Sequence, residues 1–94
     1  MNSRTYDRAL AKRALAEFRS KRRSASPADV TTLCKALGYS IDFKRGKGSH
    51  AVALRKDAPT ITIPKVFGLK IATGILTTLE EVFDRDGWNE EGHD

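Results

Sequence analysis

Apolar residues recur at helical spacing in three parts of the chain. In residues 4–23 an apolar residue stands at every fourth position, which predicts a helix with a narrow apolar stripe, made of Tyr6, Leu10, Ala14 and Phe18. The second helix, over about residues 27–37, carries its apolar residues at i, i+3, i+4 and i+7, namely Val30, Leu33, Cys34 and Leu37. The third runs from about residue 70 to 85, with one apolar face made of Ile71, Ile75, Leu79, Val82 and Phe83.

Local signals indicate where the second helix begins and ends and where the third helix ends. Ser26 can cap the second helix, Pro27 suits its first position, and Asp29 stands three residues after the cap, as in a capping box. Gly38 supplies a C-terminal stop for this helix. We expect Gly87 to end the third helix.

Between the second and third helices, apolar and polar residues alternate as in half-buried strands. Short turns separate the alternating segments and favour an antiparallel meander; the segments are residues 39–43, 50–55 and 60–63. In the middle strand we expect Val52 and Leu54 to face the helices, because they are larger than Ala51 and Ala53. The opposite face then carries small and polar residues: Ser40, Asp42, Ala51, Ala53, Arg55, Thr60 and Thr62.

The order of elements predicts an α+β protein. A helix–strand–strand–strand–helix domain spans residues 27–94, with both helices on one face of a three-stranded antiparallel sheet and an acidic C-terminal tail. A basic helical extension, residues 1–26, precedes it. This extension is expected to pack on the domain or on a second copy in a homodimer; the alternative is an arm that lies along nucleic acid.

Charge is distributed unevenly along the chain. The net charge is +5, with 17 Lys and Arg against 12 Asp and Glu. Residues 1–26 carry eight cations and two acids, residues 27–78 carry eight and three, and residues 79–94 carry one and seven. The basic part suits a polyanion such as RNA or DNA. The acidic tail could shield that surface, meet a basic partner, or keep the protein soluble.

Cysteine usage and hydropathy bear on the compartment. A single cysteine excludes an intramolecular disulfide framework, and Cys34 lies on the apolar stripe of its helix, so we expect an inert core thiol. No apolar run approaches the roughly 18 residues needed to span a bilayer, and the N-terminus lacks the apolar block of a secretory signal. These features predict a cytoplasmic protein without membrane contact.

The stretch KRGKGSH, residues 44–50, is the strongest candidate for chemistry. Lys44, Arg45 and Lys47 could hold phosphate, and Gly48 lets backbone N–H groups approach a phosphate closely. Ser49 could donate a hydrogen bond to a phosphate oxygen. The alternative is a solvated hairpin turn, in which Gly48 only supplies positive φ.

His50 follows this turn and is one of two histidines in the chain. Histidine suits proton transfer because its pKa lies near working pH, but a lone histidine at the start of a strand is also a common structural residue. Since His50 shares strand parity with Val52 and Leu54, we expect it at the rim of the helix layer. One cysteine, two histidines and no carboxylates clustered near them predict no metal ligand set, and no cofactor motif is present.

The segments LCKALGYSIDFKRGKGSHAVALR, TITIPK, LK and GILTTL resemble the HicA (YcfA-like) toxin family over about residues 28–83. Gly48-Ser49-His50 stands in register with Leu37-Gly38-Tyr39 before it and Ile63-Pro64 after it. The resemblance implies a double-stranded-RNA-binding-like α-β-β-β-α fold and a metal-independent endoribonuclease that cleaves mRNA. It also implies the toxin role in a type II toxin–antitoxin system, with a HicB-like antitoxin as partner and His50 as the catalytic residue.

The chain departs from the family pattern at several places. Lys65 stands where many members have a second histidine, and the segment after Leu69-Lys70 is about two residues longer than usual. We assign Lys65 and Lys70 to phosphate binding together with Lys44, Arg45, Lys47, Gly48 and Ser49. Two other functions remain open: a non-catalytic RNA- or DNA-binding module on the same fold, and an interaction protein that dimerises through the N-terminal helix.

Overall fold

The computed structural model describes residues 6–43 and 51–92, and for residues 88–92 it describes the backbone alone. The elements follow the predicted order: α1 (Arg8–Ser20), the short 3-10 helix η1 (Arg22–Ser24), α2 (Pro27–Ala36), β1 (Ser40–Asp42), β2 (Ala51–Leu54), β3 (Ile61–Ile63) and α3 (Leu69–Gly92). The strands form one sheet in the order β1-β2-β3, and both neighbouring pairs are antiparallel. The α+β class and the antiparallel meander are therefore confirmed.

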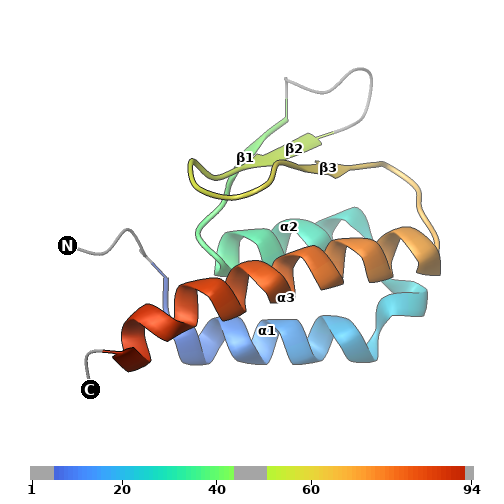
Figure 1. Cartoon of the computed structure of the whole chain (residues 1–94). Coiled ribbons are helices and arrows are strands. Elements are labelled where there is room, and N and C mark those ends of the chain that lie inside the picture. The colour runs from blue at the N-terminus through green and yellow to red at the C-terminus, as the bar shows by residue number, and fades with distance from the viewer. Residues whose placement is uncertain (1–5, 44–50, 93–94) are drawn as a thin grey trace.

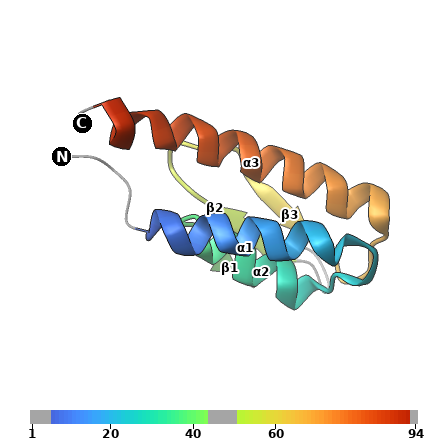
Figure 2. The same ribbon diagram turned by 90° about the horizontal axis from the view of Figure 1, so that it is seen from below.

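The elements lie in three layers. The sheet forms the first layer, α2 and α3 cover one of its faces, and α1 lies on the far side of these two helices (Figure 1). Seen from below, α1 runs beside α3 and in front of α2 (Figure 2). The expectation that both domain helices occupy one face of the sheet is confirmed.

The N-terminal helix is part of the hydrophobic core. Ala11, Leu15 and Phe18 are buried in the same cluster as residues of α2, α3 and the sheet. The predicted apolar stripe is thus partly wrong, since Leu10 is 53% exposed. The reason is that α1 contacts both α2 and α3. Ala11, Leu15 and Phe18 therefore face the line along which these two helices meet.

Both ends of α2 carry the signals expected from the sequence. Ser26 Oγ accepts a hydrogen bond from the Asp29 backbone N–H at 3.3 Å, and the Ser26 N–H donates to Asp29 Oδ2 at 2.8 Å, which completes a capping box. At the other end Gly38 has φ 88°, and the Tyr39 N–H donates to the Cys34 carbonyl at 3.0 Å. This Schellman turn directs the chain from α2 into β1.

The middle strand faces the opposite way from the expectation. Ala53 pairs with Ile41 and Ile61, and Ala51 pairs with Ile63, so these alanines share the helix-facing side with the isoleucines. Both alanines belong to the core, whereas Val52 is absent from that cluster. The prediction that Val52 and Leu54 face the helices is therefore wrong. Isoleucines of the edge strands, Ile41, Ile61 and Ile63, stand opposite these alanines and fill the helix-facing side beside them.

The third helix is longer than predicted. It continues through Gly87 to Gly92 and does not end at Gly87. A Cβ at Gly87 would collide with the guanidinium of Arg8, which donates to the Phe83 carbonyl at 2.7 Å and lies 3.6 Å from the centroid of the Phe83 ring. Gly87 thus provides space for Arg8. Within the described part of the chain, no helix has the length and apolarity needed to cross a membrane.

Candidate functional site

The end of β1, the start of β2 and the end of β3 meet at one edge of the sheet, which we call the loop end of the sheet. Asp42 at the end of β1 pairs with Val52, and Ala51 at the start of β2 pairs with Ile63 at the end of β3. The chain leaves β1 and enters β2 here, so the sequence KRGKGSH is anchored to the loop end on both sides. Six predicted site residues fall in this sequence and lie outside the described residues: Lys44, Arg45, Lys47, Gly48, Ser49 and His50.

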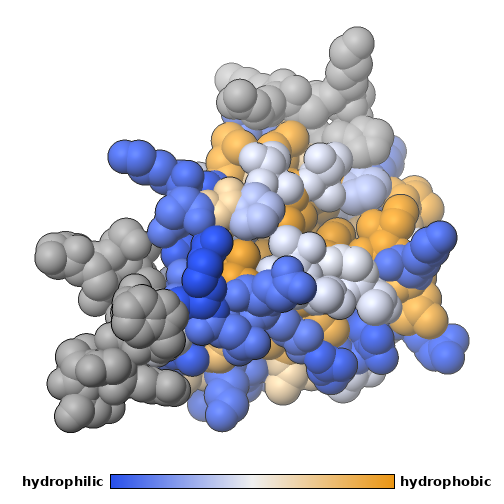
Figure 3. All heavy atoms as spheres, viewed as in Figure 1, coloured by the Kyte–Doolittle hydropathy of each residue, from blue (hydrophilic) through white to orange (hydrophobic). Residues whose placement is uncertain are grey.

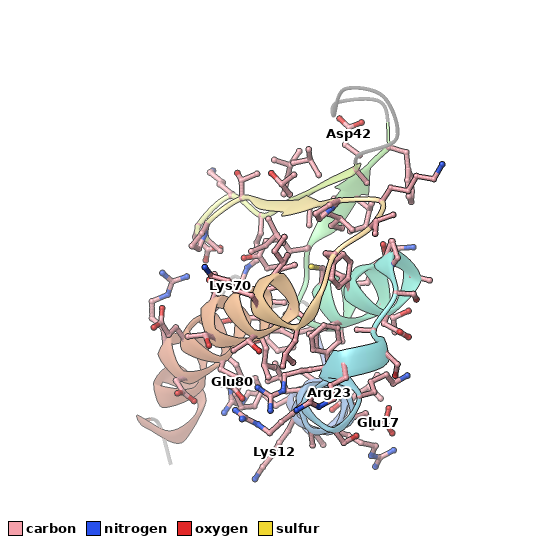
Figure 4. All side chains as sticks on the ribbon, turned by 90° about the vertical axis from the view of Figure 1, so that its right-hand side faces the viewer. Lys12, Glu17, Arg23, Asp42, Lys70 and Glu80 are labelled. Carbon is pink, nitrogen blue, oxygen red and sulfur yellow. The ribbon has the colours of Figure 1, made fainter. Side chains whose placement is uncertain are left out.

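The other two predicted phosphate-binding residues are described. Lys65 is exposed and follows Ile63 by two residues, which places it at the loop end. Lys70 is also exposed, but it belongs to the first turn of α3, and Figure 4 shows it well apart from Asp42. The structure therefore brings Lys65, and not Lys70, to the loop end.

Exposed apolar side chains accompany these two lysines. Figure 3 shows hydrophobic atoms at the surface along the right-hand side, where β3 leads into α3. Val66, Leu69 and Ile71 are exposed in this connection and in the first turn of α3. The side of the molecule formed by the β3–α3 connection is consequently both cationic and apolar.

The strand parity used to place His50 is reversed. The prediction of a rim position facing the helices depended on Val52 and Leu54 pointing toward them. These residues lie on the opposite face from Ala51 and Ala53, so that argument no longer supports the rim position. The position of His50 itself lies outside the described part of the chain.

An open groove of about 390 Å³ lies between the loop end and α2. We call it the Phe43 groove; the described residues that line it are Pro27, Ala28, Thr31, Thr32, Phe43, Ala51 and Ile63. Phe43 follows β1 directly and is 66% exposed. The sequence marked Phe43 only as the last apolar residue of an alternating strand, and no sequence signal indicated that it would be exposed.

A buried ionic cluster connects Tyr6, just before α1, and Asp86 of α3 with Arg55 in the β2–β3 turn. Arg55 Nη1 and Nη2 donate to the two carboxylate oxygens of Asp86 at 2.8 and 3.0 Å, and the two side chains are 8% and 7% exposed. The Tyr6 hydroxyl donates to Asp86 Oδ2 at 2.6 Å. Arg55 also donates to the Leu37 carbonyl at 3.1 Å, and its Nε lies 2.9 Å from Asp57 Oδ1.

These contacts assign the cluster a structural role. Every nitrogen of the Arg55 guanidinium lies against a protein acceptor, so Arg55 is held in place and does not present its donors to a ligand. The expectation that Arg55 lies on the open face of the sheet is wrong, because its partners Leu37 and Asp86 belong to the helix side. No local pattern predicts the pair, since 31 residues separate Arg55 from Asp86.

The contacts in this cluster shift the pKa values of Asp86, Tyr6 and Arg55. Burial alone would raise the pKa of Asp86, but hydrogen bonds from Arg55 and Tyr6 outweigh burial and hold that pKa below its usual range. Burial and the hydrogen bond to Asp86 raise the pKa of Tyr6 to about 12. The hydrogen bond with Asp86 raises the pKa of Arg55 further above its ordinary value. The described geometry thus fixes a carboxylate–guanidinium pair with a neutral tyrosine.

This cluster predicts a pH dependence of stability. The pKa of Asp86 is lower in the folded state than the value of about 3.9 for an unfolded aspartate. Its contribution to the free energy of unfolding is therefore complete above about pH 3.9 and is lost as the pH falls through the folded pKa. In Asp86→Asn this loss is absent, and the free energy of unfolding should fall less steeply between about pH 5 and 2 than in the wild type. Urea unfolding at a series of pH values measures both slopes. Asp29, whose pKa is also lowered, is present in both proteins and cancels in the comparison; equal slopes would contradict the prediction.

Metal binding and thiol chemistry are the two remaining kinds of reactive site to consider in the described residues. Among them, no group of three or more His, Cys, Asp and Glu side chains could hold a metal ion. Cys34 is fully buried in the core, and burial raises the pKa of its thiol to about 12. The prediction of an inert core thiol is confirmed.

Comparisons with known proteins give no relative. No family model matches the chain. No curated protein and no solved structure matches it either.

Proposed function

We propose that this chain is a metal-independent endoribonuclease that cleaves mRNA, with His50 as general acid and base. The observation that carries the proposal is the α2-β1-β2-β3-α3 arrangement, in which KRGKGSH joins β1 to β2 at the loop end of the sheet. This element order agrees with the double-stranded-RNA-binding-like fold that the HicA resemblance implies. Metal independence comes from the same resemblance.

The chemistry needs few protein groups. RNA carries its own nucleophile, the 2′-OH, so the protein has to transfer protons and stabilise negative charge. His50 would take the proton from the 2′-OH and return one to the leaving 5′ oxygen. Lys47 and Arg45 would offset the negative charge that develops on the phosphate, and Lys65, exposed at the loop end, would hold a neighbouring phosphate.

The toxin role and the partner are part of the same proposal. A cytoplasmic nuclease that cleaves mRNA has to be held inactive, and the resemblance implies a HicB-like antitoxin for that purpose. The basic charge of residues 27–78 supports a polyanionic substrate. The alternative function, a non-catalytic RNA-binding module, shares this charge but predicts binding without cleavage.

Replacing His50 by alanine tests the proposal. We expect the rate of RNA cleavage in the presence of EDTA to fall about 10²- to 10⁴-fold, the usual contribution of one general acid or base. The measurement is the disappearance of a labelled mRNA fragment, followed by growth arrest when each protein is produced in cells without antitoxin.

The chain supplies a matched control for this experiment. His93, the second histidine, lies in the acidic tail, and His93→Ala should cleave like the wild type. Equal cleavage by the wild type and His50→Ala would remove His50 from the mechanism. Binding of RNA without cleavage by the wild type would favour the non-catalytic module.

A further inference from the structure

The Phe43 groove has an unusual aromatic wall. Phe43 is 66% exposed, although it follows β1 directly and belongs by parity to the helix-facing side. Its ring forms one wall of the groove, Ala51 and Ile63 lie between, and the first turns of α2 form the other wall. An aromatic ring that is left open to solvent beside a preformed hollow is available to stack on a flat ligand.

The rest of the lining is apolar with two hydroxyl groups. Among the described residues that line the groove, none carries a charge. Thr31 and Thr32 are the residues with hydroxyl groups in this described lining, and a threonine hydroxyl can both donate and accept a hydrogen bond. Such a lining fits a ligand that has a flat apolar face and an edge of mixed donors and acceptors.

The surroundings of the groove favour an anionic ligand. Lys65 is exposed and follows Ile63, a lining residue, by two positions. Residues 27–78, which include every described lining residue, carry eight cations against three acids. A chain of phosphates that enters the groove would therefore meet positive charge.

We propose that the Phe43 groove binds an unpaired nucleobase of the RNA, stacked on Phe43, with an adjoining phosphate held by Lys65. This inference rests on the proposed ribonuclease function and narrows its substrate to single-stranded or looped RNA. A base can stack on a side chain only when it has left the helical stack, so a duplex of the same sequence does not offer it. Stacking tolerates any base, and the threonine hydroxyls can serve either donors or acceptors, so the subsite has little sequence preference.

Binding experiments in the His50→Ala background test the subsite without cleavage of the probe. Phe43→Ala should weaken binding of a short single-stranded oligouridine about 5- to 150-fold, the range measured for loss of one base–aromatic stack. It should leave binding of an abasic ribose-phosphate oligomer of equal length unchanged, because that probe carries the charges without the bases. Phe43→Tyr keeps the ring and should restore binding of oligouridine.

The controls separate stacking from folding and from catalysis. Leu10→Ala removes another exposed apolar side chain, on α1, and should not affect either probe. Equal binding of oligouridine by Phe43→Ala and its parent, or an equal loss for both probes, would overturn the subsite. The proposed function fails separately, through equal RNA cleavage by the wild type and His50→Ala, and that result leaves the comparison of the two probes intact.

Discussion

Removal of residues 1–25 is expected to abolish the folded state of the remaining chain. Ala11, Leu15 and Phe18 of α1 are buried in the common core, and without α1 the surfaces of α2 and α3 that they cover would face water. Loss of the Phe18 side chain alone should lower the free energy of unfolding by about 3–5 kcal/mol, a large part of the 5–15 kcal/mol typical of a domain. Far-UV circular dichroism and thermal unfolding of residues 26–94 measure the result.

Single substitutions in the full chain test the contribution of α1 to stability even if the truncated chain is insoluble. In the full chain, Phe18→Ala should lower the free energy of urea unfolding by about 3–5 kcal/mol, whereas Lys12→Ala, on the exposed side of α1, should change it by less than about 0.5 kcal/mol. If residues 26–94 unfold cooperatively near the wild-type temperature, α1 is a separable arm and its packing adds little.

Helices and caps carry local sequence signals, whereas the buried faces of α1 and β2 do not. Periodicity and capping residues depend on neighbours within one or two turns, so the helices and the caps of α2 could be predicted from the sequence. The buried face of α1 and the facing of β2 depend on how closely other helices approach. Ala11 and Ala53 are both fully buried, and no local pattern distinguishes such an alanine from a solvent-facing one.

The candidate site likewise has one part that adjacent residues indicate and one part that only the fold creates. KRGKGSH is recognisable from adjacent residues as a cationic, glycine-bearing stretch, whereas the Phe43 groove is created by α2, β2 and β3 together. Lys65 and Lys70 look equivalent in the sequence, but the register of β3 brings only Lys65 to the loop end. Arg55 and Asp86 meet because α3 passes beneath the β2–β3 turn, and a contact between positions so distant in sequence has no local signal.

Replacing Asp86 by alanine is the second change with a large expected effect. Arg55 would remain buried without its carboxylate partner, and breaking one side of a buried ion pair lowers the free energy of unfolding by about 3–5 kcal/mol. The Tyr6 hydroxyl would lose its acceptor at the same time. Asp84→Ala is the matched control, because Asp84 is an exposed aspartate on the same helix and its loss should change stability by less than about 0.5 kcal/mol.

A double substitution separates the desolvation of Arg55 from the attraction between the partners. Most of the loss in Asp86→Ala should come from the uncompensated guanidinium, since burial of two paired charges is itself costly. Arg55→Met combined with Asp86→Leu removes both charges and keeps apolar volume, so it should recover much of the stability lost in Asp86→Ala. Urea unfolding of the single and double variants gives the comparison. A double variant that is less stable than Asp86→Ala would mean that the hydrogen bonds from Arg55 to Asp57 and to the Leu37 carbonyl, and not the buried charge, hold the β2–β3 turn against α3.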